Sequence, residues 1–308
     1  MNGGEVLQVP YTDNIINVMM NEANTEVESF KITDAQGTSY YFESHEKVLV
    51  SSRIYNHKNR QTSEGFQPLE YTSAWYLTKI EDVNKLHSIE FKYATSYCNS
   101  EDYVLSHFYD SYTISGNHVE PEMGLYPGHF YSQVQSKYTG TSPVLSEIIF
   151  SNGRLVFNSF NDRLDGRTYR LTTISLFNTN SQLLNTVEFT HSYFAGNRLK
   201  LDKVEYKGSN DTIYDSYSFD YYNEDVYIPN GKDDQNLGLR NFGSQDPYFS
   251  RDLCGYYNGK QNTTMLCHLP SNTSGYSYYL ADRRYSAEHA KVHSLRKITY
   301  ITGGYTEL

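Results

Sequence analysis

Apolar and polar residues alternate with a period of two along much of this chain. The clearest stretch is EIIFSNGRLVFNSF at 147–160, in which Asn152 and Gly153 separate two alternating runs. Alternation places one set of side chains on each face of a strand, and Asn-Gly tolerates the positive φ angles of a tight hairpin turn. The same alternation runs through 30–43, 89–93, 187–194 and 217–222. The pattern therefore predicts antiparallel β-hairpins.

One hairpin pattern recurs along the chain. Each copy has Leu, two further residues, Ile or Val, a turn-bearing stretch, and an alternating run rich in Phe and Tyr. The copies begin at Leu77, Leu145, Leu171, Leu201 and Leu295. An isolated hairpin leaves its edges unpaired, whereas neighbouring hairpins pair each other's edges. We therefore predict that residues 77–93, 145–157 and 171–189 pair as neighbouring hairpins of one sheet.

Two stretches break the alternation and are predicted to be loop insertions. Residues 99–140 are rich in Ser, Gly, His and Tyr, and residues 223–285 are rich in Asn, Asp, Gly and Ser. The sequence thus predicts an all-β fold with a single domain over 1–308. This domain is an antiparallel array of long stacked hairpins, curved by strand twist and interrupted by the two insertions. The pattern suggests one weak helix, at 282–295.

The last copy of the repeat is SLRKITYITGGYTEL at 294–308. It contains a strand, a turn at Gly303 and Gly304, and the beginning of a return strand. We expect the chain to be a fragment of a longer protein. On that expectation, the strand at 295–300 has at least one edge whose partner this chain does not supply.

Composition and charge exclude several classes of function. The net charge is -10, with Lys+Arg 26 against Asp+Glu 36, so the chain lacks the basic footprint of a nucleic-acid binder. No stretch approaches the roughly 18 apolar residues that predict a membrane span. The start, MNGGEVLQVP, has neither the basic region nor the apolar region of a signal peptide. The 31 Tyr residues suit half-buried strand faces, because each carries an apolar ring and a polar hydroxyl.

The cysteines and the sequons add little chemistry. The three cysteines are Cys98, Cys254 and Cys267, and their odd number excludes a complete disulfide framework. Cys254 and Cys267 can pair across a hairpin, but the pattern favours free thiols or small buried hydrophobic residues. Three Asn-X-Ser/Thr sequons fit polar loops, and in a eukaryotic host they would accept glycans. They are at Asn210, Asn262 and Asn272.

Four segments carry a family resemblance. They are TSAWYLTKI (72–80), RLKLDKVEY (198–206), CGYYNGK (254–260) and LRKITYITGGYTEL (295–308). In this order they resemble the large YD-repeat, or Rhs-type, surface proteins of Bacteroidetes, and the resemblance spans about residues 30–308. The chain departs from the family at Cys254, where the family has Trp, and at Ile301, where it has Pro. The Tyr-Asp dipeptide occurs only at 109–110 and 214–215, so the chain is similar to the divergent region that precedes the regular repeats.

The resemblance implies a structural role. It implies hairpins that wind into a β-sheet shell, with any toxin activity in a separate C-terminal domain. It also implies an extracellular or bacterial cell-surface location. The implied partner is the remainder of a longer YD-repeat chain or a neighbouring β-edge. We accordingly expect a non-catalytic structural segment, not an enzyme, without a cofactor.

Glycan binding is the second hypothesis. Tyr256 and Tyr257 of CGYYNGK, and Tyr276 and Tyr278 of GYSYYL, lie near polar loops. Aromatic rings exposed in loops can stack on sugar rings, which would make these tyrosines a binding surface. Packing against the sheet is the competing explanation for each of them.

A hydrolase is the third hypothesis. The segment GNHVEPEMGLYPGHF contains His118, Glu120, Glu122 and His129, and such groups perform acid–base chemistry when a cleft holds them. A solvated polar loop explains the same residues. Glycosidase carboxylates are defined by a separation in space, which the sequence does not supply.

A metal site is considered at His289 and His293. On a helix their spacing places both on one face, where they could hold zinc. The sequence has no His-Glu-x-x-His motif and no evident third ligand, so a solvated helix face is favoured.

Overall fold

The computed structural model describes residues 10–56, 61–64, 67–98, 104–111, 129–165, 169–228, 250–262 and 281–308. These residues form one 15-stranded antiparallel sheet and a single four-residue helix. The strands are β1 (Ile15–Met20), β2 (Val27–Thr33), β3 (Ser39–Asn56), β4 (Gln61–Glu64), β5 (Leu69–Glu81), β6 (Ser88–Cys98), β7 (Val104–Ser111), β8 (His129–Phe150), β9 (Gly153–Phe160), β10 (Arg170–Asn178), β11 (Leu183–Tyr193), β12 (Leu199–Gly208), β13 (Ile213–Tyr221), β14 (Leu295–Tyr300) and β15 (Tyr305–Glu307). The all-β prediction is confirmed.

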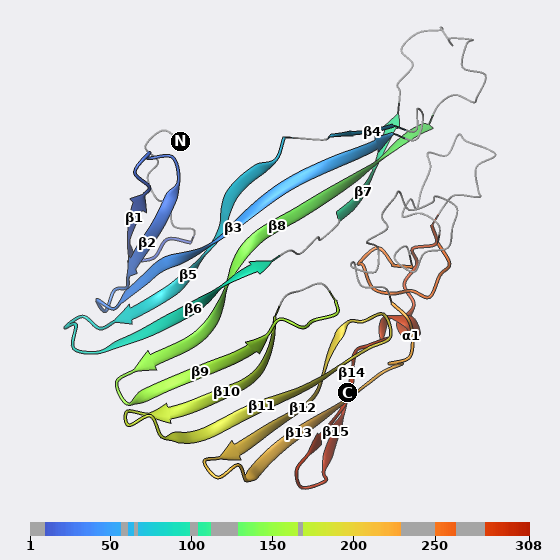
Figure 1. The fold of residues 1–308 in the computed structure, drawn as a ribbon. Helices are drawn as coiled ribbons and strands as arrows, with labels where there is room; N and C mark the ends of the chain where they lie inside the picture. The colour runs from blue at the N-terminus through green and yellow to red at the C-terminus, as the bar shows by residue number, and fades with distance from the viewer. Residues whose placement is uncertain are drawn as a thin grey trace, which may run out of the picture.

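The hairpins pair in the order in which they occur along the chain (Figure 1). Hairpins β5–β6, β8–β9 and β10–β11 contain the three predicted segments, and the pairings β6–β8 and β9–β10 join them. The next hairpin, β12–β13, pairs with β11 on one side and with β14 on the other. The predicted neighbouring hairpins are therefore confirmed.

The longest strands form an arm that the sequence did not predict. Residues 47–56 of β3 pair with residues 132–141 of β8, and β4 and β7 flank this pair (Figure 1). Part of the predicted insertion at 99–140 is therefore strand, because it contributes β7 and the first half of β8. Gly140 lies where the two long strands meet, and a Cβ atom there would lie 2.3 Å from the Lys47 carbonyl oxygen. The close approach of β3 and β8 thus requires glycine.

The spacing Leu-x-x-Ile of the repeat is produced by a β-bulge. In each of the five copies the register skips the residue after Leu, so that two residues oppose one on the neighbouring strand. The skipped residues are Thr78, Ser146, Thr172, Asp202 and Arg296. Without an extra residue, positions i and i+3 of a strand face opposite ways. With it, Leu and Ile share a face.

Side chains hold these bulges in place. The hydroxyls of Thr78, Ser146 and Thr172 donate to the carbonyl oxygens of Tyr41, Lys92 and Asn158 on the preceding strand, at 3.1, 3.0 and 3.0 Å. A bulge interrupts the ladder, so the leading Leu needs another partner for its carbonyl group. In two copies a tyrosine hydroxyl of the return strand supplies this partner.

The sheet is a single layer with two different faces. Residues that oppose each other across strands share a face, so the registers define one apolar face. The apolar face consists of Phe30, Phe42, Ile80, Phe91, Ile148, Leu155, Phe157, Ile174, Val187, Phe189, Val204, Tyr206, Tyr217, Phe219, Ile298 and Tyr300. The opposite set, the charged face, contains Lys79, Glu81, Glu90, Lys92, Glu147, Arg154, Glu188, Lys203, Glu205, Lys207 and Lys297.

Cross-strand ion pairs cover the charged face. Glu147 lies 3.3 Å from Lys92 and 3.5 Å from Arg154, which come from the strands on either side. Glu188 of β11 pairs with Lys207 of β12 at 2.5 Å, and this hydrogen bond raises the pKa of the lysine. Exposed pairs of this kind stabilise weakly, by about 0–1 kcal/mol each. Like charges do meet at one place, where Glu188 opposes Glu205 across β11 and β12. Lysines pair with both carboxylates there, Lys207 with Glu188 and Lys203 with Glu205.

Five turns share one design. In the turn from Asp34 to Thr38, the Gly37 N–H donates to the Asp34 carbonyl oxygen at 3.0 Å, with Gly37 at a φ of 86°. The Asp34 carboxylate accepts the N–H groups of Gln36 and Thr38 at 3.0 and 2.9 Å. The same arrangement begins at Asn21, Asp82, Asn178 and Asp252. Asp and Asn at the first position thus encode these turns.

Two expectations for the last segment were wrong. Strand β14 pairs on both sides, with β13 and with β15, so among the described strands the outer edge at this end of the sheet belongs to β15 and not to residues 295–300. A short return strand was enough to cover β14. The helix predicted at 282–295 is only α1 (Ala287–Ala290), because Val292 and His293 bury their side chains and His293 adopts a φ of 64°.

Candidate functional site

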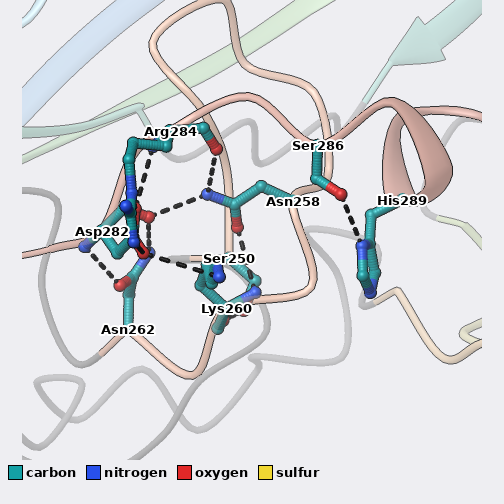
Figure 2. Close-up of polar contacts among 8 residues, drawn as sticks. All are labelled: Ser250, Asn258, Lys260, Asn262, Asp282, Arg284, Ser286 and His289. Atoms are coloured by element: carbon teal, nitrogen blue, oxygen red, sulfur yellow. Dashed lines mark hydrogen bonds and ion pairs between the residues drawn. The ribbon is translucent and has the colours of Figure 1, made fainter.

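The main polar constellation joins residues 250–262 to residues 281–289, beside the sheet (Figure 2). Its centre is Asn258, whose side chain is fully buried. The Asn258 amide donates to the carbonyl oxygens of Asp282 and Arg284 at 2.9 and 3.4 Å. Its own oxygen accepts the Lys260 N–H at 3.2 Å. A buried amide that is satisfied by backbone groups fixes two segments against each other.

Asp282 is the second anchor of the constellation. Its backbone N–H donates to Asn262 Oδ1 at 2.8 Å, and Asn262 Nδ2 donates back to the Asp282 carbonyl oxygen at 3.1 Å. The guanidinium of Arg284 forms a bidentate pair with the Asp282 carboxylate, at 2.9 and 2.7 Å. Hydrogen bonds from Arg284 hold the pKa of the Asp282 carboxyl well below its usual range. The carboxylate is therefore a permanent anion that is already paired.

The two sequons within the described residues differ in their exposure to solvent. Asn210 lies exposed in the turn between β12 and β13, as predicted. Asn262 also lies outside the strands, but it is buried and both ends of its amide are bonded to Asp282, so it is not an exposed loop residue. Asn272 lies outside the described residues. In the folded cluster the buried Asn262 amide nitrogen donates to Asp282, so this sequon does not present a surface site for a glycan.

His289 packs against a glycine of the same cluster. A Cβ atom at Gly259 would lie 2.1 Å from the His289 ring, and Gly259 has a φ of +67°. His289 Nδ1 lies 2.7 Å from Ser286 Oγ, and the Tyr257 ring meets the His289 ring edge-on at 5.9 Å between centroids. These contacts orient the imidazole ring as a packing element between α1 and residues 257–259.

His293 contacts a different part of the molecule. Its Nε2 lies 2.9 Å from the Val226 carbonyl oxygen, and its ring stacks on Phe194 with 4.2 Å between centroids. Burial, aided by the charge of Arg198, lowers the pKa of His293. Within the part of the chain that the structure describes, no group of three or more His, Cys, Asp or Glu side chains could hold a metal ion. The arrangement does not unite His289 and His293 in a metal site.

The predicted glycan-binding tyrosines have separate environments. Tyr256 is 60% exposed at the end of the Asp252 turn, whereas Tyr257 is half-buried against His289. Tyr276 and Tyr278 lie outside the described residues. Cys254 is a free, exposed thiol in the same turn as Tyr256, and Cys267 also lies outside the described residues.

The predicted acid–base residues are not assembled by the described structure. His118, Glu120 and Glu122 lie outside the described residues. His129 begins β8, where its backbone pairs with Ser111. The hydrolase hypothesis therefore stays a prediction.

A row of tyrosines marks the apolar face near its C-terminal end. Tyr217 meets Tyr206 edge-on at 6.1 Å and Tyr300 at 5.8 Å between ring centroids. The Tyr217 hydroxyl donates to Asp215 Oδ2 at 3.1 Å, and this hydrogen bond raises the pKa of the phenol. The Tyr300 hydroxyl lies 2.8 Å from Thr306 Oγ1. The edge-to-face contacts fit the sheet-packing explanation for these residues.

Comparison with known proteins identifies no relative. No family model, curated protein or solved structure matches this chain. In the described residues no helix is long and apolar enough to cross a membrane. The YD-repeat resemblance therefore remains a prediction from the four sequence segments.

Proposed function

We propose that this chain is a non-catalytic structural segment that forms part of the wall of a larger assembly. In this arrangement the apolar face is covered by the rest of the assembly, and the charged face meets solvent. The observation that carries the proposal is the continuity of the apolar face, which runs from Phe30 on β2 to Tyr300 on β14 in one layer.

The low burial of this face supports a covering partner. Buried apolar side chains in the described residues are few: Val50, Phe194, Val204, Ile228, Ala281 and Val292. Only Val204 among them belongs to the apolar face. Removing the remaining half-exposed rings and aliphatic groups from water would stabilise an assembly by about 25 cal/mol per Å² of apolar surface.

The sequence resemblance gives the assembly a class. On this proposal it is a YD-repeat, Rhs-like protein that is secreted or displayed on a bacterial cell surface, and the partner is the remainder of that chain or a neighbouring β-edge. Protease treatment of intact cells tests the location. The segment should be cleaved without lysis, and protection until lysis would contradict the proposed location.

Covalent footprinting tests the wall. Hydroxyl radicals would label tyrosines, and an amine-reactive reagent would label lysines, in this chain alone and in the full product of its gene. We expect Tyr206, Tyr217 and Tyr300 to become protected in the full product, while Lys92 and Lys203 on the charged face stay reactive. Equal labelling of the tyrosines in both samples, or protection of both faces, would contradict the proposal.

Glycan binding is a second proposal, favoured by the exposure of Tyr256 alone. This ring stands in a turn whose backbone is fixed by Asp252, so it is presented without a large loss of loop entropy on binding. A glycan array would test it with Tyr256→Ala as the comparison. Binding that is equal in the two proteins, or absent in both, would contradict this role.

A further inference from the structure

Strand β1 forms one end of the sheet, and no other described strand pairs with its outer edge. Among the strands that the structure describes, β1 pairs only with β2, through residues 15–20. An edge strand directs a row of N–H and C=O groups away from its sheet, and another strand can bind them.

The composition of β1 lacks the usual protection of an edge. Its sequence is IINVMM, without a charged residue or proline. Ile15 is 63% exposed and Met19 is 62% exposed. Natural sheets blunt their edges with charge, proline or short strands, and β1 carries none of these features over its six residues.

The other end of the sheet differs. Strand β15 has three residues and includes Glu307. The next residue, Leu308, donates its N–H to the Arg296 carbonyl oxygen at 2.9 Å, and its own carbonyl oxygen accepts the Tyr222 hydroxyl at 3.0 Å. The short, charged β15 is thus a poor template, whereas β1 is a good one.

We propose that β1 is a homotypic interface, at which β1 of a second copy of this chain pairs antiparallel about a two-fold axis. In an isologous contact each strand is both template and partner, and antiparallel pairing of one strand with itself satisfies that symmetry. The pairing brings no charged side chain of β1 opposite its own copy. Head-to-tail pairing of β1 with β15 would engage only the three residues of β15.

The pairing also continues both faces of the sheet. Ile16 and Val18 oppose Ile32 and Phe30 of β2, so they extend the apolar face to the edge. In the dimer the two apolar faces would lie side by side as one surface. The inference does not depend on the proposed wall function, because the edge is a property of the isolated chain.

Sedimentation equilibrium over a wide range of concentrations tests the interface. The wild-type chain should form dimers and no larger species. Met19→Lys introduces one charge from each copy into an edge contact that otherwise contains none, and it should weaken the dimer at least about tenfold. Leu86→Lys is the matched control: it adds the same charge at a residue that is 77% exposed in the β5–β6 turn, and it should leave the dimer unchanged.

The outcomes separate the alternatives. A wild-type chain that stays monomeric, or equal dissociation constants for the two variants, would overturn the proposal. If the wild-type chain forms species larger than dimers, and deletion of residues 305–308 abolishes them, β1 pairs head-to-tail with β15 instead. Asn17→Lys, also on β1 and exposed, repeats the test if Met19→Lys lowers the thermal stability of the monomer. If neither lysine weakens a wild-type dimer, β1 is not its interface. Footprinting of the apolar face is a separate measurement, so either proposal can fail alone.

Discussion

The hydroxyl of Tyr221 donates to the carbonyl oxygen of Leu201 at 2.7 Å. Tyr93 makes the same contact with Leu77, also at 2.7 Å. In both hairpins the acceptor is the Leu that leads the bulge, and the donor stands on the return strand. The tyrosine hydroxyl on the return strand thus supplies a hydrogen-bond donor to the leucine carbonyl at the bulge of the first strand. Burial raises the pKa of both phenols, so each hydroxyl remains a donor throughout the neutral range.

Removing the Tyr221 hydroxyl should destabilise the sheet. In Tyr221→Phe the Leu201 carbonyl group is left without that donor, and the free energy of unfolding should fall by about 1–2 kcal/mol. Urea denaturation measures it. Tyr305→Phe is the matched control, because its ring is exposed on β15, and it should change stability by less than about 0.5 kcal/mol. Equal losses in the two variants would contradict a specific role for the Tyr221–Leu201 hydrogen bond.

Deleting the bulge residue Thr172 should be far more damaging than substituting it. Thr172→Ala removes one hydroxyl donor and should cost about 1 kcal/mol. Deletion of Thr172 removes the bulge and turns Leu171 and the residues before it to the opposite face. The backbone amide hydrogens of β9 and β10 should then lose their protection from hydrogen exchange in the deletion variant only. Comparable exchange in both variants would show that the bulge is dispensable.

Gly259 should tolerate no side chain while His289 is in place. Gly259→Ala combines the positive φ with a clash against the imidazole and should destabilise residues 250–262 by about 2 kcal/mol or more. Gly255→Ala has a φ of +91° with open space around its Cβ, so it should cost only about 1 kcal/mol. Thermal unfolding compares them.

The double variant separates strain from clash. His289→Ala should recover part of the loss in Gly259→Ala and none of the loss in Gly255→Ala, which a double-mutant cycle measures. An additive result for Gly259 and His289 would mean that the ring moves away without cost.

Acid should weaken the contact made by His293. Its folded pKa lies below the ordinary value of 6.5, because burial disfavours the imidazolium form. The unfolded chain therefore binds the proton more readily. The contribution of this residue is fully present above pH 6.5 and is lost as the pH falls through the lowered folded pKa.

The pH dependence can be measured by urea unfolding between neutral and mildly acidic pH. His293→Gln should flatten part of the decline in stability below neutral pH. His87→Gln, in an exposed turn, should leave the decline as it is in the wild type. If His293→Gln and the wild type lose stability in parallel, His293 does not set this part of the pH dependence.

The hairpins could be predicted from the sequence because the residues that determine them lie close together along the chain. Alternation decides which face a residue takes, and Asp34 or Asn178 at the first turn position encodes the reversal. The repeat spacing from Leu to Ile was visible, but its cause was not, since a bulge appears only when the opposite strand is known. Two residues on one strand then oppose one on the other.

Contacts between distant segments were beyond sequence reasoning. The β3–β8 arm joins residues 47–56 to 132–141, and an alternating pattern alone is compatible with other partners and registers. The cluster around Asn258 was missed because its amide bonds to backbone carbonyls, which have no signature in the sequence. In the CGYYNGK segment the sequence points to Cys254 and to the two tyrosines as candidates, whereas in the structure Asn258 is fully buried and Gly259 contacts the His289 ring.

On the proposed wall function, the repeated bulge would also set the geometry by which the wall grows. A bulge bends its strand and increases the local twist, and here one occurs at the same place in every copy of the repeat. Each hairpin therefore contributes its own increment of curvature. In the proposed wall, the arc would then scale with the number of hairpins, and duplication or loss of a single hairpin would change the enclosed span in steps.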